Sequence, residues 1–193
     1  MMPRVDKKTA VNAMAMLKSD HQKVKDLFDK FEGESASKSK IVASALQELK
    51  VHATIEEELF YPSLRQQIED KDGLMPEADE EHHVAKVLIA ELENMKGDEE
   101  HWEAKFKVLA ESVRHHIKEE EKEIFPKARK TNIDFVALGG QMRELKDKLI
   151  RDGVPPDAEA EMIRKCGVRN DSPALKAQKT VRVPLKSKKS NAA

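Results

Sequence analysis

The sequence predicts an all-α protein: an up-down four-helix bundle, followed by a fifth, C-terminal helix and a basic, mostly disordered tail. Three observations predict this fold. Charged residues make up 37% of the 193 residues and aromatic residues only 4%, a composition typical of helices with charged outer faces. Apolar residues recur at spacings of three and four over long segments. Short polar stretches that contain glycine or proline separate these segments, as loops do.

Five helical segments follow from this pattern. They are expected at residues 10–32, 40–67, 77–95, 99–130 and 132–151. Thr9 is expected to cap the first helix. Pro62 lies inside the second and Pro126 inside the fourth, where each should bend the helix or end its regular part, because the ring removes a backbone donor. Two adjacent glycines, Gly139 and Gly140, weaken the fifth.

The chain divides into three parts. Residues 1–9 are expected to form a flexible N-terminus, residues 10–152 one folded domain, and residues 153–193 a tail of different character. From Arg164 to Ala193, nine Lys or Arg residues stand against one acid, Asp171, and few apolar residues recur at any period. Such a tail permits weak, salt-sensitive contact with nucleic acid or acidic partners.

Charge and composition exclude several classes of protein. The formal net charge is −1, so the molecule as a whole has no preference for nucleic acid or membranes. The single cysteine, Cys166, excludes an internal disulfide framework. No apolar run is long enough to span a bilayer, and the N-terminus lacks the apolar core of a signal peptide. We therefore expect a cytoplasmic protein without a membrane partner. The sequence gives no signal for the oligomeric state.

A motif that occurs twice carries the chemistry. It reads HATIEEELFYP from residue 52 and HIKEEEKEIFP from residue 116. His52 and Glu56 in the first copy, like His116 and Glu120 in the second, are four residues apart and share a helix face. That face is the apolar one, and Leu59 is expected on the same buried stripe. A carboxylate in such a stripe is costly unless it is paired, protonated or bound to a metal.

Two lone histidines complete a larger repeat. Asp20-His21 and Glu81-His82 open segments that carry apolar residues at the same offsets. Each half of the chain therefore has one histidine on its first helix and a His-x-x-x-Glu pair on its second. Two such hairpins, related by a pseudo-twofold axis, would bring six side chains together inside a bundle. The six are His21, His52, Glu56, His82, His116 and Glu120.

The ligand types indicate which metals would suit this site. Four imidazoles and two carboxylates fit a borderline or hard transition metal, because no thiolate favours copper(I) or a cluster. The symmetry favours two ions, each held by two histidines, with both glutamates bridging them. A six-coordinate ion would keep about two positions for oxide, hydroxide, water or a small molecule. A single zinc ion fits less well, since it would leave some of the six ligands unused.

Other polar residues near the two motifs have simpler interpretations. His83 and His115 lie beside the apolar stripes, where a place on the surface or behind a ligand is favoured over direct metal binding. Tyr61 is most simply a core residue, although its hydroxyl could donate a hydrogen bond near the site. The remaining glutamates of the motifs are expected to form a solvated face, with a minority orienting ligands. They are Glu57, Glu58, Glu119, Glu121 and Glu123.

These residues resemble a known family. Residues 10–151 are similar to the hemerythrin-like proteins, also called HHE cation-binding domains, through LKSDHQKVKDLF, HATIEEELFYP, EEHHVAKVLIAEL, HHIKEEEKEIFP and LGGQMRELKDKL. The resemblance implies an up-down four-helix bundle with a non-haem di-iron centre, two iron ions with an oxo or hydroxo bridge, and the six residues above as ligands. Family members are linked to oxygen binding, responses to nitric oxide and peroxide, iron sensing and repair of iron–sulfur centres.

One position departs from the oxygen carriers of the family, and three functions stay open. Oxygen-carrying hemerythrin has a second histidine four residues after the one that His82 matches; here the residue is Lys86, which argues against simple reversible oxygen carriage. The first function is binding or reduction of a small oxidant (oxygen, peroxide or nitric oxide) under oxidative or nitrosative stress. The second is an iron or oxygen sensor, or an iron-holding module, without turnover. The third is recruitment to nucleic acid or a membrane surface through the basic tail.

Overall fold

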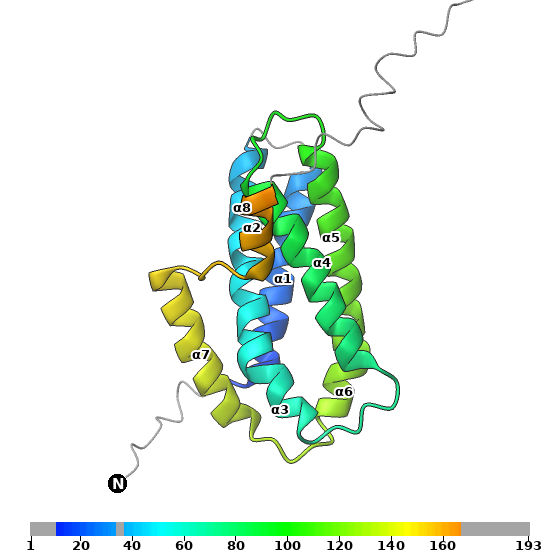
Figure 1. Cartoon of the computed structure of the whole chain (residues 1–193). Helices are drawn as coiled ribbons and strands as arrows, with labels where there is room; N and C mark the ends of the chain where they lie inside the picture. The colour runs from blue at the N-terminus through cyan, green and yellow to red at the C-terminus, as the bar shows by residue number, and fades with distance from the viewer. Residues whose placement is uncertain (1–10, 34–36, 167–193) are drawn as a thin grey trace, which may run out of the picture.

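Four long helices form the body of the molecule. The computed structural model describes residues 11–33 and 37–166, and in these residues every regular element is helical. Helices α1 (Ala13–Glu32) and α2 (Lys38–Ile55) form one hairpin, and α4 (Leu74–Glu93) and α5 (Trp102–Glu119) form the other. The two hairpins pack side by side as an up-down bundle (Figure 1). The predicted fold class is confirmed, and no described helix is long and apolar enough to cross a membrane.

The helical backbone that begins as α2, and likewise that of α5, continues past its proline through one wider turn just before it. A π-helical segment, η1 (Glu56–Phe60), joins α2 to α3 (Tyr61–Arg65), and η2 (Glu120–Ile124) joins α5 to α6 (Phe125–Ala128). In the first, the backbone N–H of Tyr61 bonds the carbonyl of Glu56, five residues back. A proline one residue further on has no N–H, and its ring would collide with the carbonyl four residues before it. The wider turn avoids this collision, so the helix continues.

Helix α1 begins later than the sequence predicted. Asn12 caps it, with its side-chain oxygen accepting a hydrogen bond from the backbone N–H of Ala15 at 3.3 Å. The expected start at residue 10 is therefore wrong by three residues, and the expected cap Thr9 lies outside the described residues. Asn is among the best residues at this position because its oxygen satisfies an N–H that the first turn leaves free.

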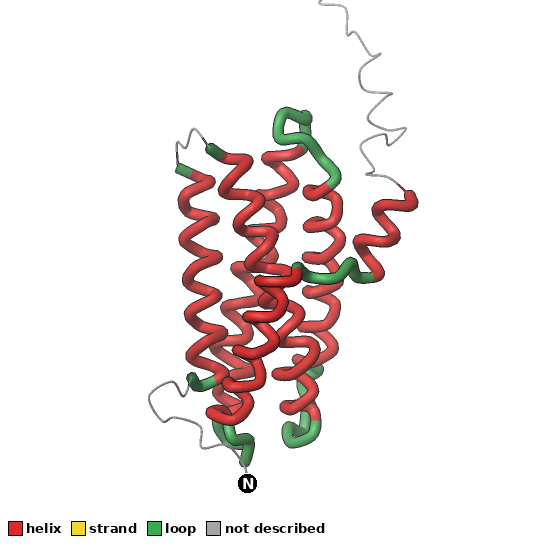
Figure 2. The backbone as a smooth tube through the Cα atoms, turned by 90° about the vertical axis from the view of Figure 1, so that its left-hand side faces the viewer, coloured by secondary structure: helices red, strands yellow, loops and turns green. Residues whose placement is uncertain are grey.

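Two further helices lie outside the bundle. Helix α7 (Phe135–Asp152) packs against α1 and α2, and α8 (Ala158–Cys166) packs against α4 (Figures 1 and 2). Helix α8 lies within the segment from residue 153 onward that was expected to be mostly disordered, and its Ile163 is only 6% exposed. The rest of the predicted tail, residues 167–193, lies outside the described part of the chain.

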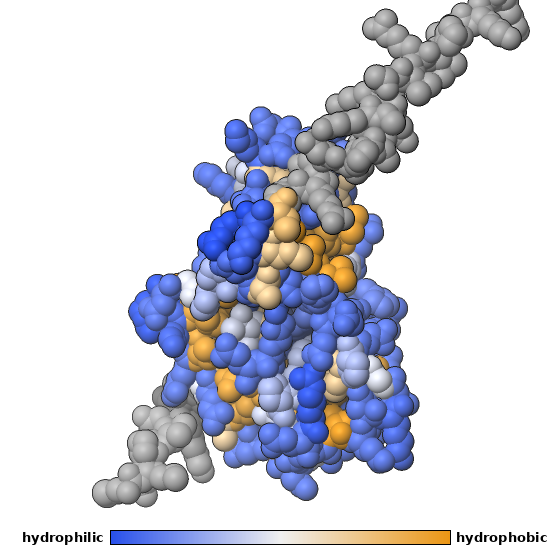
Figure 3. Space-filling view, in the orientation of Figure 1, coloured by the Kyte–Doolittle hydropathy of each residue, from blue (hydrophilic) through white to orange (hydrophobic). Residues whose placement is uncertain are grey.

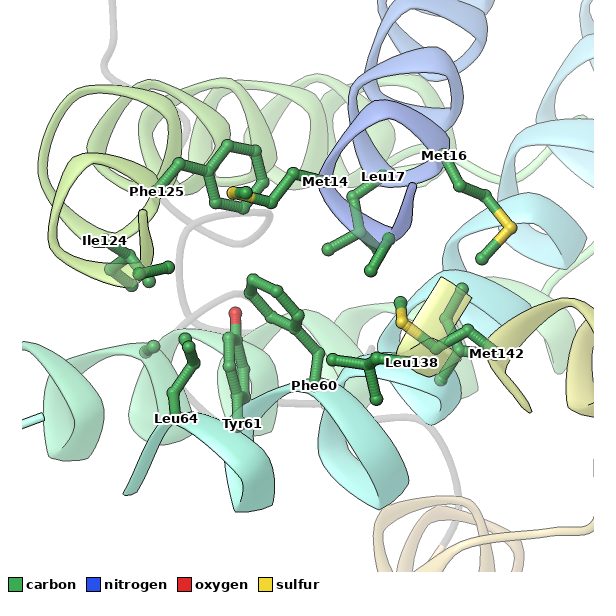
Figure 4. Packing of buried hydrophobic residues seen from close by; sticks show 14 of the residues in the cluster. Met14, Met16, Leu17, Phe60, Tyr61, Leu64, Ile124, Phe125, Leu138 and Met142 are labelled. Carbon is green, nitrogen blue, oxygen red and sulfur yellow. The ribbon is translucent and has the colours of Figure 1, made fainter. Parts of the chain in front are cut away.

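The apolar core consists of two clusters. One holds Phe60, Tyr61 and Phe125 near the prolines and reaches α7 (Figure 4). The other gathers around Phe28 and Phe106 at the opposite end of the bundle. The buried stripe predicted through Glu56 is displaced by one residue after the π turn. Phe60 is fully buried there, whereas Leu59, which was expected on the stripe, is only half-buried.

The four histidines of the repeat lie at the boundary between the two clusters. On α1, His21 follows Leu17 of the first cluster and precedes Val24 of the second. On α4, His82 lies in the same way between Ala78 and Ile89. The outer surface is mostly hydrophilic in the face that Figure 3 shows, with hydrophobic residues gathered near α7 and α8. The polar residues inside the bundle thus form one layer with an apolar layer on each side.

Candidate metal centre

The six predicted side chains meet in this middle layer. His21 comes from α1, His52 from α2, His82 from α4 and His116 from α5, while the two glutamates open the π-helical segments. Glu56 and Glu120 are 0% exposed, and no histidine of the set is more than 7% exposed. Helices α2 and α5 place each His-x-x-x-Glu pair on one face, as the spacing predicted. A π-helical segment begins at the glutamate of each His-x-x-x-Glu pair.

The side-chain nitrogen and oxygen atoms form two groups that share Glu56. Ligand atoms of His21, His52, Glu56 and Glu120 all lie within 4.8 Å of one another, and so do those of Glu56, His82 and His116. Within the first group, Nε2 of His21 lies 3.1 Å from Oε2 of Glu120, and Nε2 of His52 lies 3.1 Å from Oε1 of Glu56. Within the second, Nε2 of His82 lies 3.5 Å from Oε2 of Glu56 and 3.2 Å from Nε2 of His116.

Buried polar atoms without a hydrogen-bond partner gather at this point of the described chain. They are Oδ2 of Asp20, Nε2 of His21, both ring nitrogens of His52, both carboxylate oxygens of Glu56 and Oε2 of Glu120. Leaving one such group unsatisfied costs about 1–3 kcal/mol, and more for a charged one. Metal ions would satisfy five of these atoms, namely Nε2 of His21 and of His52, both oxygens of Glu56 and Oε2 of Glu120, because imidazole nitrogen and carboxylate oxygen are both good ligands for divalent transition metals. The other two, Nδ1 of His52 and Oδ2 of Asp20, face each other at 3.7 Å. The residues therefore fit a metal centre.

A carboxylate lies behind each of the four histidines. Nδ1 of His21 lies 2.9 Å from Oε1 of Glu121, and Nδ1 of His82 lies 2.9 Å from Oε1 of Glu57. Nδ1 of His116 lies 2.7 Å from Oε2 of Glu81. A carboxylate in this place holds the proton on Nδ1 and leaves Nε2 free to bind a metal.

The fourth histidine, His52, also has a carboxylate behind it, that of Asp20, but at a longer distance. Oδ2 of Asp20 lies 3.7 Å from Nδ1 of His52, and the other oxygen of Asp20 accepts a hydrogen bond from Lys146 of α7. Asp20 and Glu81 each precede a lone histidine in the sequence, but sequence reasoning assigned them no role. The acid at the same place in both halves of the repeat is the signal that could have revealed them.

The charges of the centre shift its pKa values strongly. Burial alone would lower the pKa of His52, but Glu56 and Asp20 outweigh it and raise the pKa to about 10. Burial would likewise lower the pKa of His82, and Glu56 and Glu57 raise it to about 9. For Glu56, burial works toward a higher pKa, but the histidines hold it well below its usual value. In the metal-free protein, protonated imidazoles thus take the place of a cation beside the carboxylate.

Of the three further residues considered from sequence, one lies at the centre. The hydroxyl of Tyr61 lies 3.3 Å from Nε2 of His116 and donates to Oε1 of Glu120 at 3.3 Å. His83 is exposed, and its Nδ1 lies 2.7 Å from Oε1 of Glu159 in α8. His115 is also exposed and contacts Glu119 rather than the buried cluster.

Lys86 occupies the position where oxygen carriers have a further histidine. Its ammonium donates to Oε2 of Glu57 at 2.5 Å, and the other oxygen of Glu57 contacts His82. Lys86 therefore takes part in the centre indirectly, through the carboxylate that orients His82.

The fold and the site together define an all-α protein with a cation-binding centre inside a four-helix bundle. The hemerythrin HHE cation-binding domain model matches residues 12–128, well over half of the chain, and the protein belongs to this family. A comparison with curated proteins finds no match. Among solved structures, a hemerythrin HHE cation-binding domain-containing protein from Mycobacterium kansasii is similar in fold, with a TM-score of 0.59 and 24% identity over 78% of this chain and 97% of that one.

Proposed function

We propose that the protein binds two iron ions at the six buried residues, as a non-haem di-iron centre, and that it binds or reduces a small oxidant there: oxygen, peroxide or nitric oxide. The observation that carries the proposal is the set of buried, unpartnered imidazole and carboxylate atoms described above. Two groups of ligand atoms that share Glu56 support two ions rather than one. Carboxylates that project from the helices into the core are the ligands of di-iron bundles, and Glu56 stands where two ions could share it.

The donor set supports iron. Nitrogen and oxygen ligands without thiolate suit iron or manganese better than copper(I), and six side chains are more than a single zinc ion uses. Bound iron would supply redox chemistry and Lewis acidity at positions that the protein does not fill. The protein itself would hold the imidazoles of His21, His82 and His116 by their Nδ1 protons and exclude water by burial. It would also offer the Tyr61 hydroxyl as a hydrogen-bond donor beside Glu120 and His116.

A role as a sensor or iron-holding module is the second candidate. Burial of two carboxylates and four histidines without metal is unfavourable, so metal occupancy should change the stability of the bundle. A sensor would respond to metal through folding or partner binding without turning over an oxidant. Turnover of peroxide by the iron-loaded protein separates the two candidates, because only the first predicts it.

The metal assignment is tested by three alanine variants. Glu56→Ala and Glu120→Ala each remove a fully buried ligand and should lower the iron content of protein purified with iron available to one ion or none. Glu58→Ala is the matched control, because Glu58 is exposed and belongs to neither group of ligand atoms. Equal iron content in all three variants would refute the assignment. An absorption change of the iron-loaded wild type on addition of nitric oxide or peroxide would support small-oxidant binding.

Three expectations from sequence stay predictions. The basic tail that would contact nucleic acid or acidic partners lies outside the described residues for most of its length. The cytoplasmic location rests on the arguments from cysteine content and apolar runs given above, and the response to oxidative or nitrosative stress rests on the family resemblance.

A further inference from the structure

We infer that the protein has a binding site for a neutral, apolar organic molecule about the size of an aromatic ring, in a cavity between α2 and α4. The cavity has a volume of about 210 Å³ and lies beside the four buried histidines. Its existence depends only on the folded chain, so the inference goes beyond the proposed function and can fail separately from it.

The size of the cavity favours an organic molecule over a diatomic gas. A cavity of about 150 Å³ lined by aliphatic side chains is large enough to hold benzene. Most of the wall area here is apolar and includes Leu49 and Ala53 from α2, Ala85 and Ile89 from α4, and Val113 from α5, whereas the four histidines and several charged side chains form the polar part of the lining. A ligand that covers the apolar part of the wall is favoured by dispersion and by release of water from it.

The charges at the edge of the cavity favour a neutral ligand. The two lysines that line it are already paired: Lys50 donates to Glu93 at 2.8 Å, and Lys86 donates to Glu57 at 2.5 Å. Further carboxylates also line the cavity and add negative charge, namely those of Asp20, Glu58, Glu81 and Asp157. An anion such as a carboxylate would meet these charges without a free ammonium to bind it, and the imidazoles of His52 and His82 already face Glu56 at 3.1 and 3.5 Å, so an anion is disfavoured.

The roof of the cavity comes from a part of the chain that the family match does not include. Val154, Pro155, Pro156 and Ala160 close it from the C-terminal side, whereas the match ends at residue 128. Helix α8 lies over this region in Figure 1 and packs against α4. Its buried Ile163 and the contact between Glu159 and His83 hold it in place. The site is therefore a property of this chain rather than of the four-helix domain alone.

The test uses fluorobenzene as the probe and the full-length protein as purified. Saturable one-to-one binding, followed by fluorine NMR, is the expected result. Ala85→Phe fills the cavity from α4 and should weaken binding at least tenfold. Ala104→Phe is the control, because Ala104 is an exposed helical alanine away from the cavity. Non-saturable partitioning into the wild type, or unchanged affinity in a folded Ala85→Phe variant, would overturn the inference.

Two further measurements complete the test. Ala53→Leu fills the cavity from α2 and should also weaken binding, so the inference stays testable if Ala85→Phe does not fold. 4-Fluorobenzoate should bind at least tenfold more weakly than fluorobenzene, and tighter binding of the anion would overturn the argument from charge. Iron content is measured in every variant: loss of probe binding with unchanged iron supports the cavity site, whereas absence of iron in the wild type would refute only the proposed function.

Discussion

Nδ1 of His82 lies 2.9 Å from Oε1 of Glu57, a residue that directly follows the buried Glu56 in the chain. One π-helical segment therefore supplies both a carboxylate inside the centre and the carboxylate that orients a histidine from another helix. The second half repeats this arrangement: Glu121 follows Glu120 and contacts Nδ1 of His21 at 2.9 Å. Each glutamate pair thus links its own hairpin to the lone histidine of the other.

Removal of the orienting carboxylate should weaken the metal centre without abolishing it. Glu57→Ala leaves all six proposed ligands in place but frees the ring of His82 and the ammonium of Lys86. Loss of such a partner typically lowers metal affinity by about 10–100-fold. Competition with a chelator measures the change, and Glu58→Ala, one residue away and exposed, should match the wild type. Unchanged affinity in Glu57→Ala would show that the contact does not orient a ligand.

The metal-free protein should lose stability as the pH rises above neutrality. Histidine has an ordinary pKa of 6.5, whereas His82 and His52 in the folded chain have pKa values of about 9 and about 10. A pKa raised by folding stabilises the folded state fully below pH 6.5, and this stabilisation is lost as the pH passes through about 9 and 10. Urea unfolding at pH 6 and at pH 9.5 should show a lower free energy of unfolding at the higher pH.

At acidic pH, the free energy of unfolding of the metal-free protein should depend on Glu56. Its pKa lies well below the ordinary 4.5, so its contribution is present above pH 4.5 and is lost as the pH falls through the lower folded value. Iron-loaded protein is the control for the alkaline side, because metal-bound imidazoles are neutral and should no longer lose protons between pH 6 and 9.5. A flat profile for the metal-free protein would contradict the charge distribution described here.

Tyr61→Phe should separate a hydrogen-bonding role from a role as a ligand. The ring of Tyr61 is fully buried, and phenylalanine keeps its packing while removing the hydroxyl. Loss of the hydrogen bond to Glu120 should lower the free energy of unfolding of the metal-free protein by about 1 kcal/mol. Iron content should stay the same; a loss of iron would show that the hydroxyl itself binds metal.

Two adjacent glycines in α7 should respond in opposite ways to alanine. A Cβ at Gly139 would lie 2.0 Å from the carbonyl oxygen of Val11 and 2.8 Å from the backbone nitrogen of Ala13, both of which are main-chain atoms that cannot turn aside. Gly139→Ala should therefore destabilise the protein by about 1–3 kcal/mol. Gly140 has no neighbour within 4 Å of such a Cβ, so Gly140→Ala should stabilise α7 by about 0.5–1 kcal/mol. Thermal unfolding of the two variants measures the difference.

Periodicity and repetition made the middle layer predictable from sequence. His52 and Glu56 are four residues apart within an apolar stripe, and the same pattern recurs at His116, so both the helix face and the pairing of hairpins could be read from spacing alone. The structure brings the six side chains together as that reasoning required. Their role as metal ligands stays a proposal.

The features that sequence did not predict depend on distances between helices. Asp20 and Glu81 lie at the edge of their apolar stripes and look like ordinary solvated acids until the opposing helix brings a histidine ring to them. Helix α8 is only nine residues long, too short for its periodicity to stand out in a charged stretch. It forms because α4 offers a surface on which Ile163 can be buried.

The π-helical segments make each hairpin sensitive to the number of residues between its glutamate and its proline. Deletion of one residue there would restore a continuous α-helix, and everything beyond it would turn by about 100° around the helix axis. Tyr61 would then point away from Glu120, and Phe60 would leave the core that Figure 4 shows. The extra residue thus fixes the direction in which the side chains beyond it point, and the same constraint acts in both halves, at Glu56–Phe60 and at Glu120–Ile124.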